Sequence, residues 1–317
     1  MSRAPGKSYR RGISIIEASE MFATEELARK WFEQWLWGGQ RCCMRCGSTN
    51  TCRASHKSMP YWCTDCRSYF SVKTGTAMER SKIPLRKWGW AIYLEMTNLK
   101  GVSSMKLHRD LGVTQKTAWF MLHRIREAFN AAGPEVMLGP IEVDEAFMGG
   151  KDKNRQKHRR LGRRWREGRT PVVAMKDRAT NRVVAEVIGE VDKQSVNAFV
   201  DRHSADDAEV YTDGTLTYYS RENHESVNHS VGEYVRGQVH TNGVESFWAM
   251  LKRGYMGVYH KLSAKHLQAY VNEYAGRHNI RDLDTIQQME HVVLGMVGRR
   301  LMYRDLIAGM GREPVAR

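Results

Sequence analysis

The spacing of apolar side chains divides the chain into a helical first part and a strand-rich second part. Residues 24–37 follow the helical spacing, with Leu27, Trp31 and Trp35 on one face. The hydroxyl of Thr24 can cap the first turn, and two glycines follow the last apolar residue. We therefore expect a capped amphipathic helix that packs through its tryptophan-rich face.

A second helical stretch covers residues 85–130. Helices are predicted over 88–98, 103–111 and 114–129, and Thr114 caps the last of them. One face of that last helix is apolar, formed by Ala118, Leu122, Ile125 and Phe129. Its polar side chains are expected outside this face, namely Gln115, Lys116, His123, Arg124 and Arg126. This order resembles a helix-turn-helix whose second helix could enter the major groove of DNA, with Lys116 and Arg124 as candidate DNA contacts. A three-helix linker domain is the alternative.

After residues 132–134 the spacing changes from helical to strand-like. Strands are predicted over 140–148, 171–175, 182–188 and 208–212, with a helix over 193–203 and another over 242–253. Three strands, a helix, a fourth strand and further helices follow the order of a ribonuclease H-like α/β fold with a mixed sheet. We expect this fold to form the catalytic domain.

Composition adds a candidate partner. The chain has 50 lysines and arginines against 35 acidic residues, a formal net charge of +15. Such a field attracts polyanions, so nucleic acid is the first partner to consider; a generically basic protein and an acidic membrane surface are the alternatives. The first 13 residues are polar and basic, and no run of about 18 apolar residues occurs. We expect an intracellular, cytoplasmic protein that is not associated with a membrane.

The cysteines form two closely spaced pairs. Cys43 and Cys46 make one C-x2-C pair, Cys63 and Cys66 make the other, and sixteen residues separate the pairs. This spacing is typical of a zinc ribbon, in which four thiolates hold one structural Zn²⁺. A redox pair or buried thiols are the alternatives. Cys42 and Cys52 lack a partner at ligand spacing and are expected to take no part.

These patterns divide the chain into five segments. They are an N-terminal tail with the amphipathic helix (1–40), a zinc ribbon (41–72), a helical, helix-turn-helix-like DNA-binding domain (82–132), the ribonuclease H-like catalytic domain (139–295) and a C-terminal tail (296–317).

A basic stretch follows the first predicted strand of the catalytic domain. Residues 151–169 hold ten lysines and arginines together with Trp165. We interpret this stretch as a loop or ribbon that follows the DNA backbone, with Trp165 able to stack on a base. The candidate DNA contacts here are Arg159, Arg160, Arg163 and Arg164. A solvated, disordered charge run is an equally good interpretation of its middle portion.

Two aspartates mark the predicted sheet. Asp144 interrupts an apolar strand, where a partly desolvated carboxylate requires a cation or a donor. Strand alternation sends the neighbouring Glu145 to the opposite face, so Asp144 is the better metal ligand. Asp213 follows the fourth strand at its C-terminal edge, where ligand sites of α/β sheets gather. A turn aspartate before glycine is the alternative for Asp213.

The helix over residues 242–253 combines a polar and an apolar face. Asn242, Glu245 and Lys252 share the polar face, and the opposite face contains Val244, Phe247, Trp248 and Leu251. The helix can therefore present polar side chains to a site while its other face anchors it in the core. A merely solvated polar face is the alternative for this helix alone.

With these motifs the chain resembles the insertion-sequence transposases of the DDE class, in particular the bacterial relatives of the Merlin elements that carry an N-terminal zinc ribbon. The matching segments are 22–31, 143–145, 211–214, 240–253, 257–263 and 265–278. The resemblance thus runs from about residue 22 to residue 279.

The resemblance implies an acidic triad that binds two Mg²⁺ ions, which Mn²⁺ could replace. By position the triad falls on Asp144, Asp213 and either Glu245 or Asn242, and we favour Glu245 because a carboxylate binds a hard cation better than an amide. Lys252 matches the family's downstream basic residue and would hold a phosphate, and the neighbouring Arg253 is a candidate DNA contact. The implied partners are the terminal inverted repeats, the target DNA and a second copy of the chain in a homodimer or higher oligomer.

In the implied mechanism, two cations about 3.5–4 Å apart activate water or a 3′-hydroxyl and stabilise the leaving oxygen. Asp144 would bridge both ions, and Asp213 and Glu245 would each complete one site. The result would be cleavage at the element's ends and joining of the 3′ ends to target DNA. The alternatives are a non-catalytic DNA-binding regulator, a ribonuclease H-like nuclease or resolvase, and an inactive descendant of a transposase.

Overall fold

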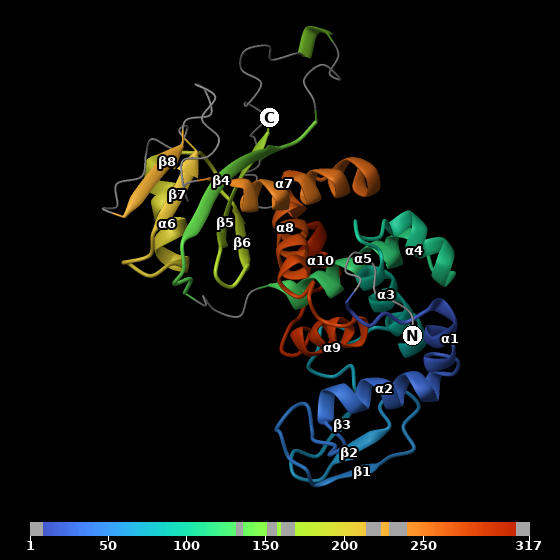
Figure 1. Cartoon of the computed structure of the whole chain (residues 1–317). Helices are drawn as coiled ribbons and strands as arrows, with labels where there is room; N and C mark the ends of the chain where they lie inside the picture. The colour runs from blue at the N-terminus through green and yellow to red at the C-terminus, as the bar shows by residue number, and fades with distance from the viewer. Residues whose placement is uncertain are drawn as a thin grey trace, which may run out of the picture. The chain divides into compact units, whose positions relative to one another are not determined.

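The computed structural model describes residues 9–130, 136–150, 157–159, 169–213, 223–227 and 240–308 (Figure 1). The chain forms two compact units, Met1–Phe129 with Ile280–Arg317, and Asn130–Asn279. Residues 280–295, which the sequence assigned to the catalytic domain, therefore pack with the N-terminal segments. No helix in the described part of the chain is long and apolar enough to cross a membrane.

The first unit begins with helices α1 (Ile15–Met21) and α2 (Glu25–Trp37). The Thr24 hydroxyl accepts a hydrogen bond from Leu27 N at 3.2 Å, and Gly38 ends α2 in the left-handed conformation, as predicted. The predicted packing face was partly wrong, because Leu27 is exposed and Phe32 is buried. Ala28 and Phe32 each lie one position after a residue of the predicted stripe, and Trp37 is also buried.

A three-stranded antiparallel sheet follows, formed by β1 (Thr51–Arg53), β2 (Tyr61–Cys63) and β3 (Ser68–Phe70) in that order. Tyr61 and Phe70 are buried against Trp37 of α2, with ring centroids 5.4 and 6.1 Å from that indole. The sheet is too small to bury a core of its own. It therefore shares one continuous apolar core with the helices of the first unit.

The remaining helices of this unit are α3 (Leu85–Thr97), α4 (Ser104–Leu111), α5 (Gln115–Arg126), the 3-10 helix η1 (Glu127–Phe129), α9 (Thr285–Gly295) and α10 (Tyr303–Ile307). Ser103 and Thr114 cap α4 and α5, and Gly112 lies between them. The expectation that His123 and Arg126 lie outside the packed face was wrong, since both are buried. His123 lies against the Trp119 ring of the same helix, with ring centroids 4.6 Å apart. The apolar core that includes α5 also contains residues of α3 and α9, and the spacing within α5 does not show which elements share that core.

The second unit is built on a five-stranded mixed sheet of order β6-β5-β4-β7-β8. The strands are β4 (Ile141–Met148), β5 (Thr170–Asp177), β6 (Val183–Val187), β7 (Val210–Asp213) and β8 (His224–Val227). β4 pairs antiparallel with β5 and parallel with β7. The mixed α/β sheet is as predicted, and its order fits a ribonuclease H-like fold. The edge strand β8 was not predicted.

Helices cover both faces of this sheet (Figure 1). They are α6 (Lys193–His203) on one face, and α7 (Asn242–Gly254) and α8 (Ala264–Asn279) on the other. A five-residue π-helix η6 (Tyr255–Tyr259) follows α7, and a 3-10 helix η3 (Lys157–Arg159) lies between β4 and β5 in sequence. In β4, Ile141 and Val143 face α6, and Ala146 and Met148 face α7 and α8. Strand alternation therefore places Asp144 on the α7 side.

Candidate functional site

Asp144 and Asp213 lie on the two central parallel strands of the second unit. The β4–β7 register pairs Val143 with Thr212, so the two aspartates occupy the next step of the ladder and share a face. One carboxylate oxygen from each of Asp144, Glu145 and Asp213 lies within 4.8 Å of the other two. Two strands far apart in sequence thus bring three acidic side chains to one place.

The expectation that Glu145 faces away from this site was wrong. Strand alternation still holds for its backbone, but β7 ends at Asp213, which is level with Asp144. A glutamate side chain is longer by one methylene than an aspartate side chain and has one more rotatable bond. Its longer side chain can therefore turn toward the aspartates, and one of its carboxylate oxygens joins theirs.

The Asp144 carboxylate is held by two donors. Trp248 Nε1 of α7 donates to Oδ2 at 3.0 Å, and the backbone N–H of Glu145 donates to Oδ1 at 2.8 Å. Desolvation, followed by the charges of Asp213 and Glu145, raises the pKa of Asp144 to about 7. A concentration of negative charge that raises a carboxyl pKa in this way is an environment that a divalent cation would stabilise.

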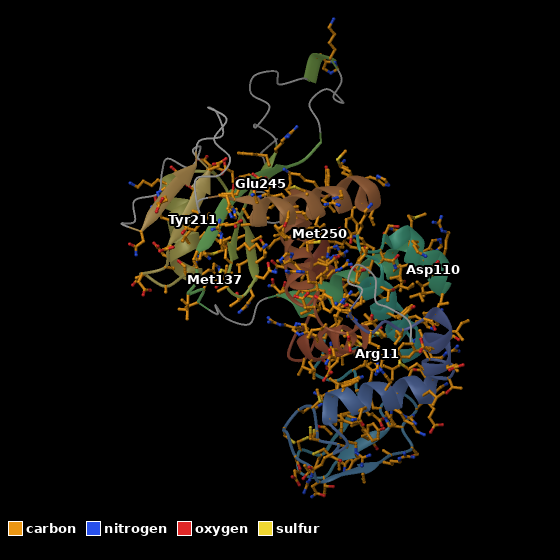
Figure 2. All side chains as sticks on the ribbon, viewed as in Figure 1. Arg11, Asp110, Met137, Tyr211, Glu245 and Met250 are labelled. Atoms are coloured by element: carbon orange, nitrogen blue, oxygen red, sulfur yellow. The ribbon has the colours of Figure 1, made fainter. Side chains whose placement is uncertain are left out.

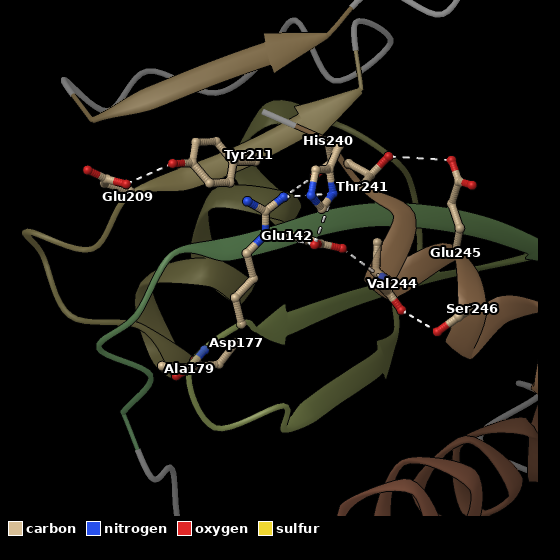
Figure 3. A network of polar contacts seen from close by, with 12 residues as sticks. Glu142, Asp177, Ala179, Glu209, Tyr211, His240, Thr241, Val244, Glu245 and Ser246 are labelled. Carbon is tan, nitrogen blue, oxygen red and sulfur yellow. Dashed lines mark hydrogen bonds and ion pairs between the residues drawn. The ribbon is translucent and has the colours of Figure 1, made fainter. Parts of the chain in front are cut away.

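Glu142 fixes the start of α7 against the sheet (Figure 3). This carboxylate is only 2% exposed, and its Oε2 accepts a hydrogen bond from Val244 N at 2.9 Å. A Cβ atom on Gly243 would lie 2.7 Å from the same oxygen, so the close approach requires glycine. Glu142 therefore determines where the first turn of α7, with Asn242 and Glu245, lies relative to Asp144.

Arg178 completes the contacts of Glu142. Its Nε donates to Glu142 Oε1 at 2.8 Å, and its Nη2 donates to the backbone oxygen of His240 at 2.7 Å. The guanidinium lies 4.5 Å from the centroid of the Tyr211 ring on β7. Tyr211 in turn donates to Glu209 Oε2 at 2.8 Å (Figure 3). The buried charge is thus paired, as a buried ion pair requires.

Sequence reasoning missed Glu142. A signal was present, because Glu142 is two residues before Asp144 and shares its strand face. A second carboxylate on a buried strand face indicates either a ligand or a buried ion pair. Its partners Arg178 and Val244 are 36 and 102 residues away, so only the fold identifies them.

The polar face of α7 carries the other predicted site residues. Glu245 lies in its first turn (Figures 2 and 3) and accepts a hydrogen bond from Thr241 Oγ1 at 3.4 Å. Its negative charge contributes to the raised pKa of Asp144. Asn242, Lys252 and Arg253 are exposed on the same helix, and Arg253 Nε donates to Ala249 O at 3.0 Å. Glu245 is therefore close enough to act on Asp144 electrostatically.

The chemistry of this cluster fits a hard divalent cation. Carboxylate oxygens are the ligands that Mg²⁺ and Mn²⁺ prefer. The two donors to Asp144 use one acceptor position on each oxygen, which leaves a second position on each for a cation. The cluster could hold such an ion through Asp144, Asp213 and Glu145, with Glu245 beside them.

The four cysteines of the two C-x2-C pairs also come together. The Sγ atoms of Cys43 and Cys66 are 3.6 Å apart, as are those of Cys46 and Cys63. Four thiolates about 2.3 Å from a tetrahedral zinc ion are about 3.8 Å from one another, so the spacing fits Zn²⁺. The N–H of Cys66 is the main cause that lowers the pKa of the Cys63 thiol to about 7, whereas desolvation and the neighbouring cysteines raise the pKa of the Cys46 thiol to about 12. Thiols held this close together resist joint deprotonation, and a bound cation would relieve that resistance. Cys42 and Cys52 lie outside this cluster.

The candidate DNA contacts have different surroundings. Lys116 is exposed, and its Nζ lies 4.5 Å from the Tyr303 ring centroid. Arg124 is half-buried, with its guanidinium 4.3 Å from the Phe120 ring centroid. Arg160, Arg163 and Arg164 lie outside the described residues, as does the side chain of Arg159. Trp165 also lies outside them.

Comparison with known proteins agrees with this geometry. Residues 136–279 match the family model of the ISXO2-like transposase domain. This part of the chain is therefore similar to that transposase family. The chain is also similar to an uncharacterized protein in transposable element ISH50 of Halobacterium salinarum. The two are 28% identical over 275 residues, which cover 82% of this chain and 92% of the relative. The resemblance to insertion-sequence transposases is thus confirmed, and the transposase domain contains the acidic cluster and α7.

Proposed function

We propose that this chain is a DNA transposase that cleaves the ends of a mobile element and joins their 3′ ends to target DNA. The observation that carries the proposal is the convergence of the Asp144, Glu145 and Asp213 carboxylates inside a transposase domain. A cluster of this kind is costly to fold unless a cation compensates it. It therefore indicates a function that uses the cation.

In the proposed site, Asp144 and Asp213 hold two divalent cations together with Glu245. Trp248 and the backbone N–H of Glu145 orient Asp144 and leave one acceptor position on each of its oxygens for a cation. Asn242 is the alternative third ligand, and Glu145 is a further candidate because its oxygen lies within 4.8 Å of the aspartate oxygens. When bound, two Mg²⁺ or Mn²⁺ ions would activate the attacking oxygen and stabilise the leaving oxygen of the phosphodiester.

The remaining residues bind and position DNA in this proposal. Lys252 and Arg253, exposed in the last turn of α7, would contact phosphates beside the acidic cluster. Segments 41–72 and 82–132, the zinc ribbon and the helix-turn-helix-like domain, would bind the terminal inverted repeats. Transposition requires two element ends at once, so the active form would be a homodimer or higher oligomer on DNA in the bacterial cytoplasm.

The direct experiment incubates the purified protein with a duplex carrying an end of its own element, target DNA and Mg²⁺. We expect nicking at the 3′ end and joining of that end to the target, and we expect Asp144→Ala to abolish both while still binding the duplex. Nicking without joining would indicate a nuclease or resolvase instead. Binding without nicking by the wild type would indicate a regulator or an inactive descendant.

A further inference from the structure

The first unit contains a cleft that the acidic cluster does not explain. Its volume is about 920 Å³. The walls come from α2, the turn between Cys43 and Cys46, the loop between β1 and β2, the segment after β3 and the start of α3. The cleft therefore lies where the cysteine-rich sheet meets the helices of this unit.

The lining of this cleft is strongly basic. Seven lysines and arginines line it, against the two glutamates Glu25 and Glu79. Glu25 accepts hydrogen bonds from the backbone N–H groups of Leu85 at 2.7 Å and Arg86 at 3.1 Å, so it caps α3. Because Glu25 is hydrogen-bonded to the start of α3, it is less available to neutralise the basic side chains. The lysines and arginines of the cleft therefore far outnumber the acidic groups that could pair with them.

Four of these basic side chains form no ion pair with an acidic residue in the part of the chain that the structure describes. They are Arg45, Lys57, Arg80 and Lys82, and all four are exposed. Like charges held near one another repel, and an anion would relieve that repulsion. The cleft is therefore built to receive negative charge from outside the chain.

The loop that carries Arg80 and Lys82 is braced from below. Lys73 Nζ donates to Ser81 O at 3.2 Å and to Ile83 O at 2.5 Å. Arg80 adopts φ of 59°, a left-handed conformation that costs a non-glycine residue about 1 kcal/mol. Lys73 thus supports a strained backbone that presents Arg80 and Lys82 on either side of Ser81.

The basic surface continues past this loop. A second hollow of about 220 Å³ shares Arg80, Ser81 and Lys82 with the cleft and reaches Arg124 of α5. A single phosphate ion would contact only part of such a path, whereas a polymer with evenly spaced phosphates could follow all of it. Arginine and lysine on a rigid loop are the usual contacts to phosphate oxygens.

We propose that the cleft lined by Arg45, Lys57, Arg80 and Lys82 binds the sugar-phosphate backbone of duplex DNA. The inference rests on the proposed function, because it adds a contact path for the DNA that the transposase acts on. In this role Lys73 is a positioning residue, and Arg80 and Lys82 contact phosphates. Contacts of this kind fix the register of the duplex and do not read its sequence.

The test measures binding of a fluorescein-labelled 30-base-pair duplex by fluorescence anisotropy without Mg²⁺ at several salt concentrations. We expect the double variant Arg80→Gln, Lys82→Gln to bind at least tenfold more weakly and to lower the slope of log K against log salt by about two. The control Lys30→Gln, Arg304→Gln removes the same charge from exposed positions outside the cleft. That control should change the slope by less than half as much.

A wild-type measurement covers the case in which the double variant folds poorly. Acetylation of lysines by a soluble ester, read by mass spectrometry, should be slowed by the duplex at Lys57 and Lys82 and unchanged at Lys30. A double variant with the wild-type slope, or equal acetylation with and without DNA, would overturn the proposal. The proposal would also be overturned if the double variant bound a duplex RNA of equal length more weakly than the wild type but bound the DNA duplex equally well. None of these readouts requires cleavage, so a failure of the proposed catalysis is seen separately, as absent nicking with intact binding.

Discussion

Trp248 Nε1 donates a hydrogen bond to Asp144 Oδ2 at 3.0 Å, across 104 residues of sequence. The indole belongs to the buried face of α7, and the carboxylate belongs to the central strand β4. One helix therefore packs the core and orients the acidic cluster through the same side chain. This coupling makes the site sensitive to changes that leave its carboxylates intact.

The first prediction concerns this hydrogen bond. Trp248→Phe keeps an aromatic ring in the core and removes the donor, so the Asp144 carboxylate loses a group that orients it. We expect metal-dependent strand nicking to fall about 10- to 100-fold, as for other groups that support metal ligands. Zinc content and far-ultraviolet circular dichroism should stay at the wild-type values. Nicking at the wild-type rate would show that the orientation of Asp144 by Trp248 has no role in the reaction.

The second prediction concerns the buried ion pair between Glu142 and Arg178. Glu142→Gln removes the charge that compensates Arg178 while keeping the side chain's shape. We expect the free energy of unfolding to fall by about 3 kcal/mol, because the arginine charge stays buried without its partner. The matched control is Arg202→Gln, which breaks the more exposed pair with Glu186 and should cost less than about 1 kcal/mol. Equal losses for the two variants in urea denaturation would contradict this account.

Asp144 and Glu145 show how much of the candidate site could be predicted from the sequence. The sequence placed Asp144 in a strand and Asp213 at the end of another, but that the two meet was expected only from the resemblance to transposases. Their shared level is visible in the register of β4 with β7. Alternation misplaced Glu145, because it describes the direction of the backbone and not how far a long side chain can reach. The catalytic roles of Asp144, Asp213, Glu245, Asn242 and Lys252 stay predictions.

In the first unit, the sequence predicted local features correctly and missed contacts between residues far apart in the chain. Thr24 and Thr114 cap their helices as expected, because a cap depends on residues three positions apart. His123 and Arg126 are buried, although the spacing of apolar residues along α5 placed both side chains outside the packed face. That spacing describes one helix and not the other elements of the apolar core to which α5 belongs.

The third prediction concerns the cysteine cluster. Cys46→Ser should remove one thiolate from the four and reduce bound zinc, measured by atomic emission, from one ion per chain to well below half. The sheet β1–β3 depends on that ion, so the thermal unfolding temperature of the first unit should also fall. The control Cys52→Ser changes an exposed cysteine of β1 outside the cluster and should keep the full zinc content. Equal zinc loss in both variants would contradict the assignment of the four ligands.

The fourth prediction concerns the packing of α7 on α8. A Cβ atom on Gly254 would overlap the hydroxyl of Tyr274, which is itself buried. We expect Gly254→Ala to reduce the free energy of unfolding by about 1–3 kcal/mol through this overpacking. Gly257→Ala is the control, because a Cβ there meets no atom within 4 Å. Combining Gly254→Ala with Tyr274→Phe should restore part of the loss, and no restoration would refute the proposed overlap.

In the proposed site, Asp144, Asp213 and Glu245 would together hold one pair of divalent cations. Electron paramagnetic resonance counts bound Mn²⁺ directly and is blind to the zinc of the cysteine cluster. With a duplex element end present, we expect about two Mn²⁺ ions per wild-type chain and a clear loss of bound Mn²⁺ in both Asp144→Asn and Asp213→Asn. Wild-type Mn²⁺ binding by these two folded variants would contradict the account.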